Sequence, residues 1–116
     1  MINRVVFLGR IVAGPRPDRT EAGAPCTVVT LEVREPHFRG KGEDVTTLDA
    51  RVVGEKPGAV WERYLAVGQD LLVTGRLLHE GGRMLVHCRD WSFVGRGVRT
   101  IDCAFEAYAS EGARSA

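Results

Sequence analysis

The chain has 116 residues, of which 44% are hydrophobic and 27% are charged, and its formal net charge is +1. This length fits one domain with its own core, and the composition is that of a globular protein. No apolar run approaches the roughly 18 residues that a membrane-spanning helix needs, and the first residues lack a signal-peptide pattern. These features exclude membrane-spanning and disordered classes and predict a cytoplasmic protein.

The cysteine and charge counts exclude further classes without naming a function. Cys26, Cys88 and Cys103 are odd in number and lack metal-ligand spacing, so we expect reduced thiols, no metal site and no cofactor. A net charge of +1 is too small to indicate nucleic-acid binding by itself. All basic residues except Lys41 and Lys56 are arginines, which bind phosphate bidentately and stack on bases. Genomic nucleotide bias would produce the same arginine-rich composition.

The first half of the chain reads as three strands. Residues 3–12 are rich in β-branched and apolar residues around Gly9, and a glycine inside a strand often marks a bend. Residues 14–18 (GPRPD) are predicted to be a loop, and residues 21–25 a turn. The later segments are an alternating strand, a polar excursion and a third strand, over residues 26–34, 35–44 and 45–53.

The second half begins with a short helix. Val60, Trp61, Tyr64 and Leu65 have the spacing of one helical face, which predicts a helix over residues 59–65. Pro57 suits its first turn, and Gly68 is expected to end it. Two strands follow, joined by a tight turn at Gly81-Gly82, and they span residues 70–78 and 83–94.

The order of these elements predicts an all-β fold. Five strands with one short helix between the third and the fourth match the five-stranded Greek-key OB-fold barrel, whose sheet face and loops bind oligonucleotides or oligosaccharides. Small sandwiches and SH3-like barrels also have five strands, so the position of the helix is the more specific sign. We expect residues 1–96 to form this domain.

Residues 97–116 are expected to form a C-terminal extension. Ile101, Phe105 and Tyr108 fall at i, i+4 and i+7, which fits a short amphipathic helix or an added strand. The small, polar residues at the end fit a frayed tail instead.

Two stretches carry a resemblance to a known family. The opening Met1–Arg10 (MINRVVFLGR) and the stretch Tyr64–Leu77 (YLAVGQDLLVTGRL) resemble the first strand and the helix end, glycine turn and fourth strand of bacterial single-stranded DNA-binding proteins. Residues 18–23 and 30–33 are similar to the family's first hairpin and second strand. The resemblance covers most of residues 1–94. It implies an OB-fold, non-sequence-specific binding of single-stranded DNA in replication, recombination or repair, and assembly as a homodimer or homotetramer.

The resemblance and the chemistry of strand binding together suggest site residues. Such binding needs cations along the phosphates and flat side chains on which bases stack. The predicted DNA-binding residues are Arg10, Arg34, His37, Phe38, Arg39, Lys41, Arg51, Arg76 and Arg83. The resemblance implies subunit pairing through the first strand, for which the candidates are Asn3, Val5 and Phe7.

The sequence departs from the family pattern in two ways. Leu48 and Gly54 stand where family members usually carry an aromatic residue, and the hairpin tip at residues 79–82 is short. The family's acidic tail, which recruits replication and repair proteins, has no counterpart in this sequence, so recruitment by that route is not expected. Shorter relatives, such as the dimeric primosomal replication protein, also lack that tail.

Two other classes of function remain open at this stage. The barrel could be a protein-interaction module with weak or lost DNA binding, whose contact residues would be Trp61, Phe105 and Tyr108. A metal-dependent nuclease would need clustered carboxylates. Asp44, Asp49 and Asp90 lie on separate segments with no spacing that joins them, so we expect no enzyme.

Overall fold

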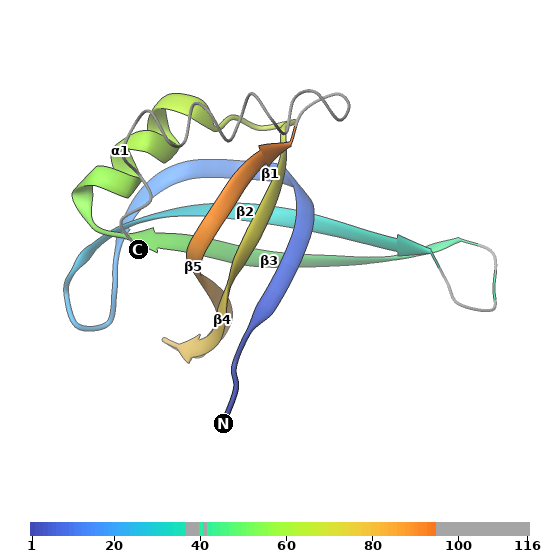
Figure 1. Ribbon diagram of the computed structural model, residues 1–116, viewed down its shortest axis with the longest axis horizontal. Helices are drawn as coiled ribbons and strands as arrows, with labels where there is room; N and C mark the ends of the chain where they lie inside the picture. The colour runs from blue at the N-terminus through green and yellow to red at the C-terminus, as the bar shows by residue number, and fades with distance from the viewer. Residues whose placement is uncertain (37–39, 41, 95–116) are drawn as a thin grey trace.

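A computed structural model of the chain describes residues 1–36, 40 and 42–94. This part of the chain forms five strands and one helix, which Figure 1 shows in their spatial arrangement. The elements are β1 (Val5–Arg19), β2 (Pro25–Pro36), β3 (Glu43–Val53), α1 (Glu55–Tyr64), β4 (Asp70–Glu80) and β5 (Arg83–Val94). No helix in the described ranges is long and apolar enough to span a membrane.

The five strands close into a barrel in the order β1-β2-β3-β5-β4. All neighbours are antiparallel except β3 and β5, which run parallel from Asp49↔Leu85 to Arg51↔His87. The helix α1 follows β3 and contacts β1, β2 and β3, so that it covers one end of the barrel (Figure 1). The predicted OB-fold barrel, with its helix between the third and fourth strands, is confirmed.

The core follows from strand alternation, because every second side chain points to the same face. Val29 and Leu31 of β2 and Ala50 and Val52 of β3 point inward and are fully buried. The fully buried Trp61 closes the covered end: its ring meets that of Trp91 edge-on, with 5.7 Å between centroids and 88° between planes. The helix is therefore held by its aromatic residue rather than by its surface charges.

The first strand is longer than the sequence predicted. The expected loop at residues 14–18 is wrong, since β1 continues to Arg19 and pairs with β2 as far as Arg19↔Pro25. The register shifts between Ile11 and Ala13 and again between Ala13 and Arg16. Pro15 falls inside the second shift, where no ladder N–H is required, so proline does not end the strand.

The helix also begins earlier than predicted, at Glu55, and ends at Tyr64. Pro57 lies in its first turn as expected. Gly68 does not cap the helix, because the cap is Leu65 and Gly68 lies in the turn before β4. The sequence prediction had placed Gly68 at the end of the helix, but Gly68 belongs to the turn that follows.

Glycine determines the backbone at two places in β4 and after it, and the first is the predicted turn at Gly81-Gly82. Gly81 and Gly82 have φ angles of 60° and 77° and form the tight turn between β4 and β5. Gly75 lies at the irregularity of the β4–β5 ladder, where a Cβ atom would overlap the backbone carbonyl of His87. The strand bends there because only glycine allows this approach.

Beyond the barrel, β2 and β3 continue as a two-stranded arm that ends with the pair Pro36↔Glu43 (Figure 1). The predictions for residues 97–116 lie outside the described residues. The domain boundary at residue 96 therefore stays a prediction.

Candidate nucleic-acid interface

The outer faces of β2 and β3 carry two of the arginines predicted to meet DNA, Arg34 and Arg51. Val29 and Leu31 point into the core, so Thr30, Glu32 and Arg34 lie on the outer face of β2. By the same alternation, Asp49 and Arg51 lie on the outer face of β3. Register places Thr30 opposite Asp49, so charged groups of both signs are interleaved on this surface.

Arg51 is engaged within the protein. Only 6% of the residue is exposed, and both terminal nitrogens of its guanidinium donate to the two carboxylate oxygens of Glu80 at 2.9 Å. Hydrogen bonding by Arg51, and by the backbone N–H of Glu21, lowers the pKa of Glu80 to about 2. The hydrogen bonds with Glu80 raise the pKa of Arg51 above its usual value. This bidentate pair ties β3 to the end of β4, and the burial of Arg51 keeps its guanidinium away from a phosphate at the surface.

Asp49 is the centre of a second charged cluster. Its carboxylate accepts from Arg83 at 2.7 Å, from the Thr30 hydroxyl at 2.8 Å and from Arg16 at 3.5 Å. Arg83 also donates to Asp18 at 3.3 Å. The predicted site residue Arg83 is therefore shared between two carboxylates. Arg16, Asp49 and Asp18 were not among the predicted site residues.

Arg34 and Arg10 are exposed but paired. Arg34 donates to Glu32 at 2.7 Å and to Glu43 at 3.2 Å, and these hydrogen bonds raise its pKa. Arg10 donates to Asp70 at 3.2 Å. Exposed ion pairs contribute little to stability, about 0–1 kcal/mol, so an incoming phosphate can displace these carboxylates at small cost.

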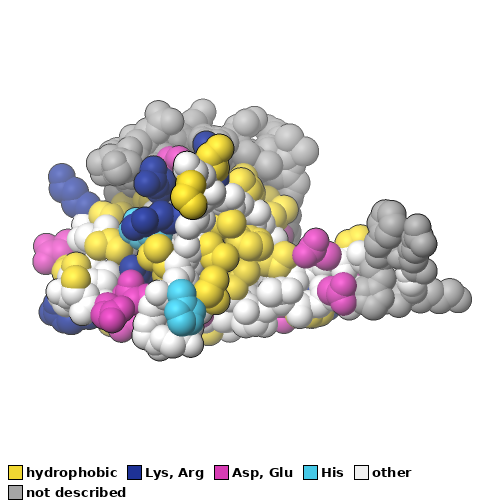
Figure 2. All heavy atoms as spheres, turned by 90° about the horizontal axis from the view of Figure 1, so that it is seen from below, with side chains coloured by type: hydrophobic (Ala, Val, Ile, Leu, Met, Phe, Trp, Pro, Cys, Tyr) yellow, Lys and Arg dark blue, Asp and Glu magenta, His cyan; other side chains and the backbone are white. Residues whose placement is uncertain are grey.

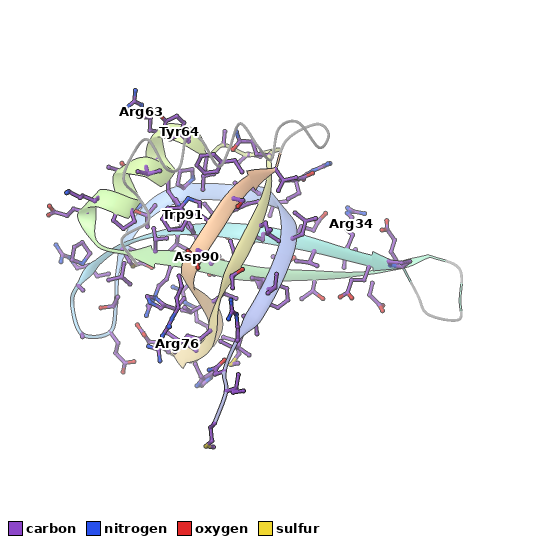
Figure 3. The ribbon with its side chains drawn as sticks, viewed as in Figure 1. Arg34, Arg63, Tyr64, Arg76, Asp90 and Trp91 are labelled. Carbon is purple, nitrogen blue, oxygen red and sulfur yellow. The ribbon has the colours of Figure 1, made fainter. Side chains whose placement is uncertain are left out.

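Arg76 is exposed and forms no ion pair with any residue of the described ranges. Figure 3 shows it near the lower end of β4, far from Arg34 on the arm. The remaining predicted residues, His37, Phe38, Arg39 and Lys41, lie outside the described part of the chain. The structure therefore spreads the predicted residues over several surfaces instead of collecting them in one.

The described aromatic side chains serve the core rather than the surface. Trp61 and Trp91 pack against each other inside the barrel, and Tyr64 packs against Phe93 with 5.7 Å between ring centroids. Phe7 also packs against the core. Trp61 is fully buried, so the suggestion that it forms an exposed contact with a partner protein is wrong.

The apolar side chains that β1 exposes to solvent are not the ones predicted for subunit pairing. Val5 and Phe7 are partly buried and pack against the core, whereas Val6 and Leu8 are 59% and 53% exposed. Leu8 lies opposite Leu72 of β4. Asn3 forms two hydrogen bonds with the backbone of Leu77, which fasten the N-terminal segment to β4. Figure 2 shows hydrophobic side chains gathered on the face seen there.

Within the described ranges, no group of three or more His, Cys, Asp and Glu side chains is arranged to hold a metal ion. Asp49, one of the carboxylates considered for catalysis, is instead held by Arg16, Arg83 and Thr30. Cys88 is buried, which raises its pKa well above the ordinary value, and burial likewise raises that of Cys26. Both thiols are therefore poor nucleophiles.

The barrel order and the position of the helix define an OB-fold, a class of proteins whose sheet face and loops bind oligonucleotides or oligosaccharides. Residues 2–81 match the Single-strand binding protein family. The chain belongs to this family, and the match extends from the N-terminal segment through the end of β4.

One relative and three solved structures extend this result. Single-stranded DNA-binding protein 3 of Listeria innocua is 35% identical over 77 residues, which cover 66% of this chain and 48% of that protein. The chain thus matches about half the length of this relative. A small single-stranded DNA-binding protein from Streptomyces coelicolor has the same fold, with a TM-score of 0.66, 17% identity, and coverage of 84% of this chain and 99% of that one.

The other two solved structures have the same fold, with similar TM-scores and similarly low sequence identity. The protein PriB from Ralstonia solanacearum aligns with a TM-score of 0.65 and 20% identity over 80% of this chain and 98% of that one. The single-strand binding protein of Plasmodium falciparum, solved in complex with single-stranded DNA, aligns with a TM-score of 0.66 and 16% identity, covering 81% and 96%. At these identities the likeness establishes the fold alone.

Proposed function

We propose that this protein binds single-stranded DNA without sequence specificity and serves replication, recombination or repair in the cytoplasm as a binding protein rather than an enzyme. The observation that carries this proposal is the family match over residues 2–81, which includes β1 to β4 of the barrel. The relative from Listeria innocua carries the same function in its name.

The described surface supports phosphate binding through exchange of partners. The side chains of Arg10, Arg34 and Arg83 are 63%, 55% and 44% exposed, and each forms an ion pair with a carboxylate at the surface. A phosphodiester offers the same bidentate geometry as the carboxylate it replaces. A phosphate that must displace a carboxylate gains less binding free energy than one that meets an unpaired arginine. We therefore expect weak, salt-sensitive contacts from these residues.

We assign base stacking to residues that follow β2 in the sequence and lie outside the described part of the chain. The described aromatic rings are packed in or against the core, and we therefore propose Phe38, with His37, as the stacking side chains. Arg39 and Lys41 would contact phosphates beside them. A stacked base contributes roughly 1–3 kcal/mol, so Phe38→Ala is expected to weaken binding by at least about fivefold.

We also propose that the protein is a homo-oligomer, assembled through the outward side of β1. Val6 and Leu8 expose apolar surface beside Leu72, and such a patch on a family member fits a subunit contact. Light scattering on Leu8→Glu should report a smaller species than the unmodified chain. Val45→Glu, which adds the same charge at another exposed apolar position, should leave the mass unchanged. A monomeric unmodified chain would contradict this proposal.

The function itself is tested by fluorescence anisotropy with labelled oligothymidine at low salt. We expect binding at micromolar protein or below, with unlabelled single strands competing far better than duplex DNA. If no binding occurs at low salt, the alternative of a protein-interaction module on the same barrel becomes the better account.

A further inference from the structure

Three arginines differ from all others in the described part of the chain. Arg10, Arg16, Arg34, Arg51 and Arg83 are paired with carboxylates. Arg19 donates to the carbonyl of Gly23, and Arg63 lies over the ring of Tyr64. Within residues 1–36, 40 and 42–94, the arginines whose side chains make no ion pair, hydrogen bond or ring contact are Arg4, Arg76 and Arg89. All three are exposed.

These three unpaired arginines line the same cavity. Its volume is about 550 Å³, and its wall is formed by residues 1–4, residues 74–76, Arg89 and Asp90. A volume of about 300–1,000 Å³ is usual for small-ligand sites, so the cavity is large enough for a phosphate with its sugar. Figure 3 shows Arg76 and Asp90 on the neighbouring strands β4 and β5.

The topology explains how arginines from three segments meet there. Asn3 bonds to the backbone of Leu77, and Val5 pairs with Gly75, so Arg4 lies beside Arg76. On the other side of β4, Thr74 pairs with Asp90 and Gly75 pairs with Cys88. Arg89 is therefore the extra residue of a β-bulge, a device that redirects a side chain at sheet edges and functional sites.

The charge balance of the cavity is positive. Asp90 is the one acidic residue in its wall, against three arginines. The pKa of the neighbouring, half-buried His87 is consistent with this positive charge. Its pKa is lowered by burial and then by Arg51, Arg76 and Arg89. A second positive charge is disfavoured here, and an anion is favoured.

We propose that this cavity is a phosphate-binding subsite that holds the backbone of the single strand. The inference rests on the proposed function and deepens it. A phosphate that enters the cavity meets guanidinium groups without displacing a carboxylate, unlike a phosphate at Arg34 or Arg83. Each unpaired arginine therefore contributes more binding than a paired one. Thr74 places a hydroxyl donor in the same wall.

The test is the affinity for fluorescent oligothymidine of Arg76→Ala, of Arg89→Ala and of the double variant, each over a salt series. Each single variant should bind about tenfold more weakly at low salt. Each should also reduce the slope of log affinity against log salt by about 0.7, the value for one phosphate contact on a single strand. Lys56→Ala removes one exposed positive charge from α1 and should change neither quantity by more than a small fraction.

A variant that is expected to strengthen binding distinguishes the loss of a phosphate contact from damage to the fold. Asp90→Asn removes the negative charge of the cavity and should strengthen binding, whereas a change that merely disturbs β5 would weaken it. A 5′-phosphorylated and a 5′-hydroxyl oligonucleotide should bind equally, because the subsite holds the strand's internal phosphates. Binding of the phosphorylated form alone would overturn the inference.

The outcomes also separate this inference from the proposed function. If the unmodified chain binds oligothymidine and the double variant has the same affinity and salt slope, the subsite is refuted and the function stands. If the unmodified chain does not bind at low salt, the function fails, and the subsite fails with it. Thermal unfolding of each variant, monitored by circular dichroism, should match the unmodified chain because Arg76, Arg89 and Asp90 are exposed.

Discussion

Two regions of the barrel surface use arginine in opposite ways. On the outer face of β2, β3 and the start of β5, Arg34, Arg51 and Arg83 are each held by carboxylates. At the N-terminal segment, β4 and the bulge of β5, Arg4, Arg76 and Arg89 face a shared cavity without ion pairs. The first region gains stability and fixed geometry, and the second keeps its donors available.

The comparison explains how a protein with a net charge of +1 can bind a polyanion. In the described part of the chain, the charges of Arg10, Arg16, Arg34, Arg51 and Arg83 are each cancelled by a neighbouring carboxylate. The net charge of the chain therefore says little about any local site. What matters is which arginines lack a partner.

Gly75→Ala should damage the place where the two regions meet. A Cβ atom at this position would overlap the backbone carbonyl of His87, which cannot move independently of the ladder. We expect the free energy of unfolding to fall by about 3 kcal/mol, at the upper end of overpacking costs. Urea unfolding measures the change. Gly23→Ala adds backbone strain, because Gly23 has a φ of 91°, but no clash, because no atom lies within 4 Å of the added Cβ. It should therefore cost less than Gly75→Ala, and equal losses would refute the packing explanation.

The Arg51–Glu80 pair should make stability depend on acid pH. The pKa of Glu80 is lowered to about 2 from an ordinary 4.5. Its contribution is therefore complete above about pH 4.5 and is lost as the pH falls toward 2. Thermal unfolding of the unmodified chain and of Glu80→Gln at several pH values gives the difference. The stability gap between them should shrink over this range, and a constant gap would contradict the assignment.

Asp49→Asn should convert part of the paired region into an unpaired one. Removing this carboxylate's charge releases Arg16 and weakens the hold on Arg83. Oligothymidine affinity should rise about fivefold at low salt, the scale of one charge-assisted hydrogen bond made available. Glu62→Gln removes an acidic charge from α1 and serves as the control. Unchanged or weaker binding by Asp49→Asn, with an intact fold, would show that the paired arginines do not meet DNA.

Arg34→Ala should have the smallest effect. Its guanidinium must leave Glu32 and Glu43 before it binds a phosphate, so its net contribution is small. We expect the affinity for oligothymidine to fall about twofold, against about tenfold for Arg76→Ala. Anisotropy titrations of both variants in one buffer give the ratio. A larger loss for Arg34→Ala than for Arg76→Ala would reverse the proposed ranking.

Local sequence signals predicted most of the fold. The strand over residues 83–94 and the Gly81-Gly82 turn follow from alternation and turn chemistry, and the structure has them at the predicted positions. The loop predicted at residues 14–18 failed because a register shift lets a strand pass through Pro15. Such shifts are set by the partner strand and leave no local signal.

The candidate site was less accessible to sequence reasoning. Arg51 and Glu80 are 29 positions apart, and Asp49 and Arg83 are 34 apart, so no local pattern pairs them. The sequence also did not indicate that Arg89 belongs to the site, because the direction of its side chain depends on a bulge opposite Gly75. The sequence identified arginine as the binding side chain, but only the barrel decides which arginines are already occupied.

The salt dependence of oligothymidine binding by the unmodified chain tests the central claim most directly. If a single strand is held by the three unpaired arginines, the slope of log affinity against log salt should be about −2 or steeper, since each phosphate contributes about 0.7. The paired arginines can only add to this value. A slope near zero, or no binding at low salt, would contradict the account.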